Sequence, residues 1–455
     1  MMKYQGIYDN SPIFIQNFMA TMYGYKIKKE RFGEYYYEHL DFLNSFNNFS
    51  KKKQEEHQFE EVMKLIEYAS KNSRFYRELY KEVNITEFKN INDLTKLPIV
   101  TKEMVRQNIE DIITIPKGKA IKSNTGGTTG KSLTVYYKKE DNQRRMATLD
   151  YFKAIHGFMN IKMKRATFNG KHIIPPNQKQ KKFWRYNVAI KQMIYSSFYI
   201  SDENIPYYIE SLNKYKPESI DGFISSIYDI ASYIERNNIK LKFIPKAIFP
   251  TSETVTQEHR DVIERVFNSK IRDQYASSEG APFVWECESG KLHYDISTGI
   301  IENIENSNEI LITSFTTYGT PLIRYKIGDS MTFENNNTSC DCGLKTPLIE
   351  SIQGRVVDFL YSTKGAKIYL GNVSNIFKNI PNAIAKAQLI QSSLTNMVVR
   401  MVVDKNFKEE HKSMLIDEIK HKFGNDMRIE IEIVEEIPRE KSGKYKLIVN
   451  NVVTR

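Results

Sequence analysis

The chain has 455 residues, 40% of them hydrophobic and 12% aromatic, and carries a formal net charge of +11. That length exceeds what one hydrophobic core usually serves, so we expect two or three domains. The positive excess is spread over short polar clusters typical of a solvated surface, which argues against a nucleic-acid-binding protein. No run of about twenty apolar residues predicts a membrane span, and the start lacks the apolar core of a secretion signal. We therefore expect a cytoplasmic protein.

The first 355 residues predict helices followed by mixed structure. Residues 1–85 combine amphipathic helical patterns with aromatic side chains, and we expect a helical segment packed on the main domain. From 86 to 355, apolar runs typical of strands alternate with helical patterns, which predicts an α/β core. The clearest elements expected here are a short helix at 101–107, strands at 241–249 and 310–317, and a helix at 258–267.

The last hundred residues, 356–455, have the pattern of a smaller α+β domain. Its apolar stretches at 387–403 and 429–434 flank a helical pattern at 409–423. We therefore predict an α/β fold in which a large N-terminal multi-sheet domain precedes a small α+β C-terminal domain.

A loop with the sequence SNTGGTTGKS at 123–132 combines glycines, hydroxyl side chains and a lysine. Glycines let a backbone approach a ligand closely, and successive N–H groups with a lysine suit the phosphates of a nucleotide. A Walker loop is disfavoured, because its first glycine would fall at Thr125 and because a β-like run follows where that loop would open a helix. A plain Gly/Thr hairpin turn is the alternative.

Four later segments fit the same ligand. In QYASSEG at 274–280, an aromatic side chain suits a base and a carboxylate suits Mg²⁺ beside phosphates. LIRYKIGD at 322–329 ends in an acid that can accept hydrogen bonds from a ribose diol. GRVVD at 354–358 follows, and IPREKSGK at 437–444 places a lysine on a flexible loop able to enter a site.

In this order and spacing, the five segments resemble the adenylate-forming superfamily, which contains acyl-CoA synthetases, luciferases and adenylation domains. Within it the chain looks most like the phenylacetate–CoA ligase group, in particular its CapK-like branch associated with polysaccharide biosynthesis. The aromatic N-terminal block and the run from Lys216 to Ser226 suggest that branch. The resemblance covers nearly the whole chain from about residue 60.

The resemblance implies an ATP-dependent enzyme that adenylates a small carboxylic acid, releases pyrophosphate and passes the acyl group to CoA. An amine of a sugar or amino acid is the alternative acceptor, and a non-catalytic nucleotide-binding relative is the alternative class. ATP, Mg²⁺ and CoA are the implied cofactors and substrates. A mobile C-terminal domain would rotate between the two half-reactions.

The same resemblance assigns roles to individual residues. It places the nucleotide phosphates against Thr125, Gly126, Gly127, Thr128, Thr129, Gly130 and Lys131. It lines the adenine and acyl-adenylate with Ser252, Glu253, Tyr275, Ala276, Ser277 and Ser278. Asp329 would bind the ribose with help from Arg355, Glu279 would hold Mg²⁺, and Lys444 would bridge the carboxylate and the α-phosphate. Ala276 stands where relatives have glycine, Val357 interrupts the usual hinge acids, and Lys446 is a neighbouring candidate for the lysine role.

The cysteines form a separate pattern. All three, Cys287, Cys340 and Cys342, lie within one window that also contains His293. Three thiols and one imidazole form a four-ligand zinc set, which leaves no open position and so predicts a structural metal. The odd count in a cytosolic chain argues against a disulfide framework. Separate thiols with a surface histidine remain the alternative.

Overall fold

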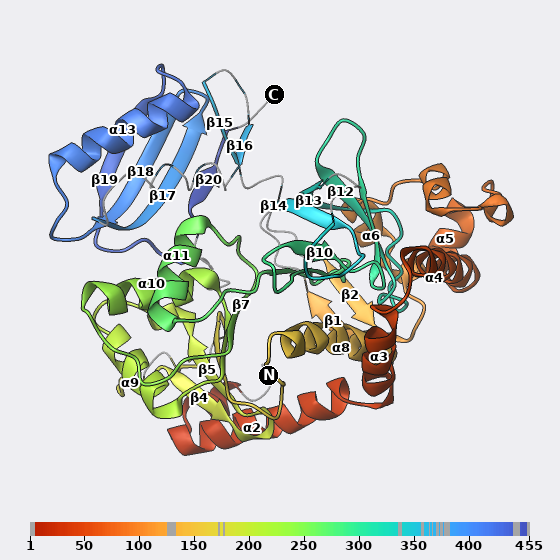
Figure 1. The fold of residues 1–455 in the computed structure, drawn as a ribbon, viewed down its shortest axis with the longest axis horizontal. Coiled ribbons are helices and arrows are strands. Elements are labelled where there is room, and N and C mark those ends of the chain that lie inside the picture. Colours follow the sequence, from red (N-terminus) through yellow and green to blue (C-terminus); the bar gives the residue numbers. More distant parts are fainter. Residues whose placement is uncertain are drawn as a thin grey trace.

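The computed structural model describes residues 5–124, 133–171, 173–175, 178–334, 339–355, 359–363, 365, 367–369, 373, 376, 383–439 and 446–452. Within these residues, helices combine with five sheets (Figure 1). This confirms the α/β class predicted from the sequence. None of the described helices has the length and hydropathy to cross a bilayer.

The N-terminal part is helical, as predicted. Its helices are α1 (Gln5–Asp9), α2 (Ile13–Arg31), α3 (Glu34–Phe46), α4 (Lys51–Asn72), α5 (Arg74–Leu79), α6 (Lys102–Gln107) and α7 (Ile109–Ile112). The long helix α4 begins where the Ser50 side chain accepts a hydrogen bond from the backbone N–H of Lys53. Its buried positions Val62, Leu65, Ile66 and Ala69 have helical spacing.

A five-stranded sheet occupies the middle of the chain. Its strands are β3 (Arg165–Asn169), β4 (Trp184–Asn187), β5 (Gln192–Ser196), β6 (Ser219–Gly222) and β7 (Ala247–Pro250), in the order β4-β5-β3-β6-β7. All neighbouring pairs are parallel except β4 with β5. Helices α9 (Ile205–Tyr215), α10 (Ile224–Arg236) and α11 (Gln257–Phe267) share a hydrophobic core with it. The predicted strand at 241–249 is shorter, because Pro245 lacks the N–H that a ladder needs.

A seven-stranded antiparallel sheet forms the second large layer. Its strands are β8 (Gln274–Tyr275), β9 (Val284–Glu286), β10 (Leu292–Tyr294), β11 (Gly299–Asn303), β12 (Glu309–Ser314), β13 (Tyr325–Phe333) and β14 (Leu348–Arg355), in the order β11-β12-β13-β14-β10-β9-β8. It shares a core with α4, and the hairpin of β1 (Ile121–Asn124) and β2 (Thr134–Tyr137) contributes to that core. Helix α8 (Lys139–Ile155) follows this hairpin.

The C-terminal part has a core of its own. It contains β15 (Phe359–Tyr361), β16 (Lys367–Tyr369), β17 (Ile384–Ser393), β18 (Asn396–Val403), α13 (Glu409–Phe423), β19 (Arg428–Ile433) and β20 (Ile448–Asn450). The four-stranded sheet has the order β19-β18-β17-β20, and α13 lies along one of its faces (Figure 1). Buried Met397, Val399 and Met401 alternate along β18 and pack with α13, as the period-2 pattern predicts.

Candidate active site

The carboxyl ends of the parallel strands β6 and β7 bring two predicted segments together. The backbone N–H of Thr251 donates to the carbonyl of Gly222 at 2.9 Å. Gly222 has a φ of +128°, and a Cβ there would lie 1.9 Å from the carbonyl oxygen of Phe168, so only glycine fits. Ser252 adopts a left-handed φ of +68°. This loop therefore turns sharply at the sheet edge where open α/β sheets bind ligands.

Glu253 at this edge is held in a fixed orientation by the start of α10. The backbone N–H of Ser225 donates to its Oε2 at 2.9 Å, and the Ser225 hydroxyl donates to its Oε1 at 3.0 Å. Charge-assisted pairs of this kind position a carboxylate well. The first residues of α10 thus orient an acid that the family resemblance predicts at the adenylate site.

Tyr275 and Asp329 meet although they lie on different strands. The Tyr275 hydroxyl at the end of β8 donates to Asp329 Oδ2 of β13 at 2.6 Å. Asp329 is buried and is the register partner of Arg355 across β13 and β14. The structure therefore brings together residues from the predicted base, ribose and GRVVD segments.

Two polar side chains donate hydrogen bonds to the backbone of the segment between Tyr275 and Gly280. The Tyr137 hydroxyl donates to the Ser278 carbonyl and Arg145 donates to the Ser277 carbonyl, both at 2.7 Å. Burial raises the pKa of Tyr137 to about 12, and the nearby Glu279 carboxylate adds to the rise. Glu279 itself is buried, whereas Ala276 is exposed.

These contacts also place strand β2 beside the segment that contains Glu279. Tyr137 belongs to β2, which directly follows the glycine-rich loop. Asn124 and Thr134 pair in the antiparallel register of β1 and β2, so a strand follows the loop and the helix of a Walker motif does not. Thr125–Lys131 and Lys444 lie outside the described residues, as do the hinge candidates Val357 and Asp358.

The sequence motifs did not identify two residues that contact this site. Tyr137 and Arg145 lie in a strand and a helix with no motif, and their roles depend on contacts with residues more than 130 positions away. The only local signal is their position, since an aromatic residue and an arginine shortly after a predicted phosphate-binding loop are candidates for supporting residues.

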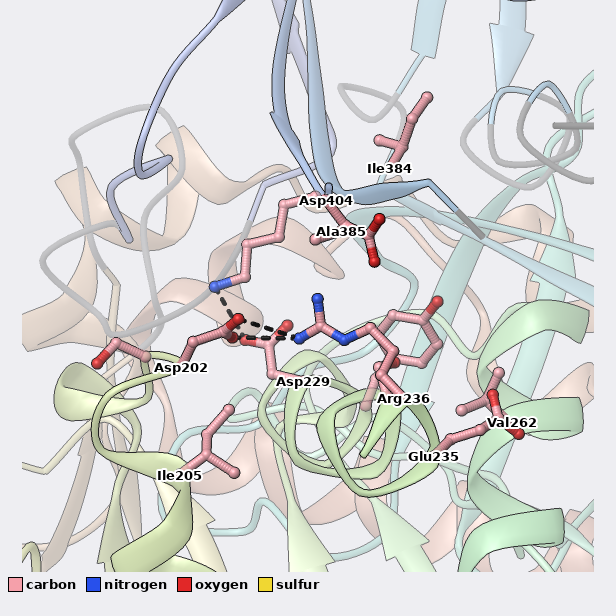
Figure 2. Close-up of a pocket in the computed structure, with 13 residues that line it drawn as sticks. Asp202, Ile205, Asp229, Glu235, Arg236, Val262, Ile384, Ala385 and Asp404 are labelled. Atoms are coloured by element: carbon pink, nitrogen blue, oxygen red, sulfur yellow. Dashed lines mark hydrogen bonds and ion pairs between the residues drawn. The ribbon is translucent and has the colours of Figure 1, made fainter. Parts of the chain in front are cut away.

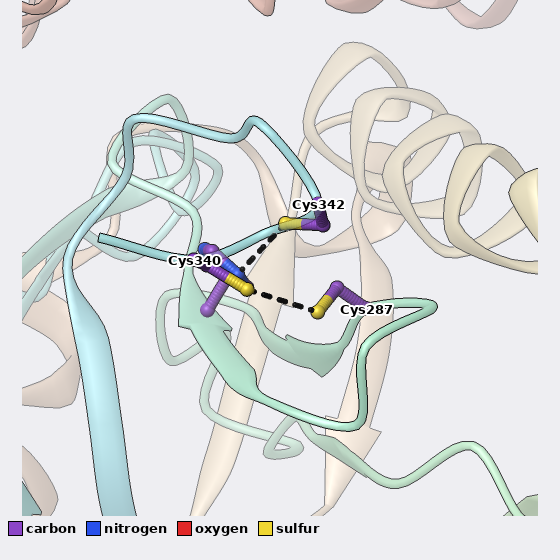
Figure 3. Close-up of side chains that lie close together, drawn as sticks. Cys287, Cys340 and Cys342 are labelled. Carbon is purple, nitrogen blue, oxygen red and sulfur yellow. Dashed lines mark hydrogen bonds between the residues drawn. The ribbon is translucent and has the colours of Figure 1, made fainter. Parts of the chain in front are cut away.

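The cysteine cluster assembles as the sequence predicts. Cys287 follows β9, His293 lies in β10, and Cys340 and Cys342 precede β14. Their ligand atoms all lie within 4.8 Å of one another. Figure 3 shows the three sulfur atoms gathered between these segments. The Sγ atoms of Cys287 and Cys340 are 3.6 Å apart, and Cys342 Sγ is 3.3 Å from His293 Nε2.

These spacings fit a tetrahedral zinc ion. Zinc–sulfur and zinc–nitrogen bonds of about 2.3 and 2.0 Å imply sulfur–sulfur separations near 3.8 Å and sulfur–nitrogen separations near 3.5 Å. The other ring nitrogen of His293 lies 3.1 Å from the Thr346 hydroxyl, a contact that orients the imidazole. Burial lowers the pKa of His293, which favours the neutral form that binds metals. Four protein ligands would give zinc a structural role.

We expect purified protein to contain about one zinc per chain, as a four-ligand structural site requires. Cys342→Ser should abolish zinc retention and lower the melting temperature, while Thr346→Val should weaken zinc affinity by about 10- to 100-fold without removing it. Elemental analysis and chelator titrations followed by thermal melts measure these effects. A folded, metal-free wild-type protein with three titratable thiols would contradict the site.

Comparisons with known proteins place the chain. The CapK C-terminal domain model matches residues 360–451. Protein CapK of Staphylococcus aureus is 39% identical over 451 residues, which cover 98% of this chain and 99% of that protein. The chain belongs to the CapK family. Membership in the CapK family confirms the branch that the sequence resembles.

Solved structures show the fold of this CapK-family chain. 2-Hydroxyisobutyryl-CoA ligase in the postadenylation state, in complex with 2-HIB-AMP, has a TM-score of 0.72 at 14% identity. The match covers 89% of this chain and 91% of that ligase. The same ligase in the thioesterification state, with 2-HIB-AMP and CoA, has a TM-score of 0.54, with 90% and 91% covered. The chain thus has the fold of adenylate-forming CoA ligases.

Proposed function

We propose that this protein is an AMP-forming acid ligase. It would catalyse the attack of a small carboxylic acid on the α-phosphate of ATP to form an acyl-adenylate and pyrophosphate, and then transfer the acyl group to an acceptor with release of AMP. The observation that carries the proposal is the hydrogen bond between Tyr275 and Asp329, whose backbone register partner is Arg355. The neighbouring Gln274 donates to the carbonyl of Pro250, at the start of the loop that contains Glu253. Tyr275, Asp329 and Arg355 come from separate strands and the resemblance assigns all of them to one bound adenylate.

The proposed chemistry gives each charged residue of these motifs a purpose. A carboxylate and a triphosphate are both anions, so their approach needs positive charge at the reacting phosphate. Lys131 and Lys444 would supply it, and Mg²⁺ held by Glu279 would neutralise the departing pyrophosphate. Tyr275 and Asp329 would orient the nucleoside, which fixes the α-phosphate for in-line attack.

The proposal extends to domains, acceptor and location. Residues 1–85 would pack on a core at 86–355 that binds nucleotide and acid, and 356–455 would be the mobile domain. CoA is the first acceptor to test, because the neighbouring ligase binds CoA. An amine of a sugar or amino acid is the second, because the CapK-like branch is associated with polysaccharide biosynthesis. The reaction would take place in the cytoplasm, where ATP is available.

The test is isotope exchange between pyrophosphate and ATP across a panel of carboxylic acids, followed by mass spectrometry with CoA and amino-sugar acceptors. We expect at least one acid to support exchange. Asp329→Ala should weaken ATP binding about 10- to 100-fold, since hydrogen bonds to a charged group contribute about 1.5–3 kcal/mol. Tyr275→Phe should have a smaller effect in the same direction. No exchange and no affinity for ATP or AMP would refute the proposal.

A further inference from the structure

Asp229 of α10 contacts two cations that come from the C-terminal domain. Its Oδ2 lies 2.7 Å from the Arg439 guanidinium and 3.3 Å from Lys386 Nζ. The Asp229 and Arg439 side chains are only 9% and 10% exposed. Figure 2 shows Asp229 pointing toward the segment of Ala385 and Asp404, across a cavity of about 60 Å³. One buried carboxylate thus joins α10 to two separate parts of the C-terminal domain.

Arg439 also reaches the candidate active site. A second guanidinium nitrogen donates to the Ser225 hydroxyl at 3.1 Å. Ser225 lies one helical turn before Asp229 and is the residue that orients Glu253. A continuous set of polar contacts therefore runs from Glu253 through Ser225 to Arg439 and Asp229.

The contact between Arg439 and Asp229 matters because Arg439 lies close in sequence to the proposed catalytic lysine. Arg439 precedes Lys444 by five residues. Five residues span at most about 18 Å when fully extended, so the contact of Arg439 with α10 bears directly on the segment proposed to carry the catalytic lysine.

We propose that Asp229 and Arg439 form an ionic latch that holds the C-terminal domain in its adenylation arrangement and opens before acyl transfer. The latch, defined by these two residues, is a positioning device for the proposed function and rests on it. The comparisons support this arrangement, since the chain resembles 2-hydroxyisobutyryl-CoA ligase more in its postadenylation state than in its thioesterification state, with TM-scores of 0.72 and 0.54.

Asp229→Asn tests the latch, because it keeps the side-chain shape and removes the charge. We expect pyrophosphate exchange to fall at least about tenfold, as for other buried charged pairs. Acyl transfer from a supplied acyl-adenylate should stay within about twofold of wild type or become faster, because opening is no longer opposed.

Asp202→Asn is the matched control. Asp202 lines the same cavity, but it pairs with Arg236 at 3.2 Å on the surface and is 72% exposed. This variant should leave both half-reactions within about twofold of wild type, as expected for an exposed pair. Equal loss of both half-reactions in Asp229→Asn, or no loss in either, would overturn the latch.

A measurement that needs no substrate tests the latch independently of the proposed ligase activity. Hydrogen–deuterium exchange of the wild-type protein should protect 224–236 and the start of β17, and Asp229→Asn should raise exchange there several-fold. Asp202→Asn should not. Unchanged protection would reject the latch even if the enzyme is active. Raised exchange in a protein inactive with every acid would retain the latch and reject the ligase proposal.

Discussion

Lys444→Ala should lower pyrophosphate exchange by about 10² to 10³, the usual loss when one preorganised charge contact to a transition state is removed. In the proposed reaction two anions combine at the α-phosphate, and the lysine offsets the charge that develops there. Acyl transfer from a supplied acyl-adenylate should keep most of its rate, because that step no longer forms the bond between acid and phosphate. Quenched assays of each half-reaction measure the two rates separately.

Lys446→Ala is the comparison for this variant, since it removes a lysine two positions further along the same segment. We expect it to retain exchange within about threefold, as for a charge outside the reacting centre. If Lys446→Ala lost exchange and Lys444→Ala did not, the two roles would be interchanged. An equal loss of both half-reactions in Lys444→Ala would contradict a role confined to adenylation.

Asp221→Asn should lower the free energy of unfolding by about 3–5 kcal/mol, the cost of leaving a buried partner charge uncompensated. Asp221 of β6 lies 3.1 Å from Lys153 and 3.5 Å from Arg165, and Thr167 donates a short hydrogen bond to it. All three charged side chains are at most 10% exposed. Guanidinium denaturation followed by circular dichroism measures the loss.

The pH dependence of this loss has a defined sign. Burial alone would raise the pKa of Asp221, but Lys153 and Arg165 outweigh it and hold that pKa below the ordinary value of 3.8. The carboxylate therefore contributes its stabilisation above about pH 4, and the contribution disappears as the pH falls through the lowered pKa. The difference between wild type and Asp221→Asn should be constant from pH 5 to 8 and shrink in stronger acid.

Glu203→Gln provides the contrast for Asp221→Asn. Glu203 pairs with Lys181 at 2.6 Å, yet the two side chains are 76% and 45% exposed. Exposed pairs contribute about 0–1 kcal/mol because water screens them. A loss in Asp221→Asn no larger than the loss in Glu203→Gln would show that water reaches the Asp221 cluster in the folded protein.

The elements that sequence patterns predicted well are those whose periodicity reflects a single buried face. The helix predicted at 409–423 matches α13 at both ends, because Leu415, Ile419 and Phe423 repeat at helical spacing over the C-terminal sheet. The apolar stretch at 387–403 became two strands joined at Ser393–Asn396, since polar residues there interrupt the pattern. The strand predicted at 241–249 begins later, after Pro245.

Site residues could be predicted where the residue type itself indicates a chemical role. They could not be predicted where the role depends on contacts between distant parts of the chain. Cysteines and a histidine in one window gave the cluster that the structure brings together. Asp229 could not be predicted in this way, because an aspartate on an amphipathic helix is common. Its role depends on an arginine far away in the sequence. Asp221 likewise lies in an apolar strand with no motif, and its two partners come from other elements.

The pairing of β20 with β17 has a practical consequence for anyone engineering this protein. The segment at 440–445 is bordered on one side by Arg439, which contacts α10, and on the other by β20, which adds a parallel strand to the sheet edge. Truncation of the chain before Ile448 would remove the attachment through β20. Expression plasmids should therefore keep these final strand residues intact, because Ile448 is buried in the C-terminal core.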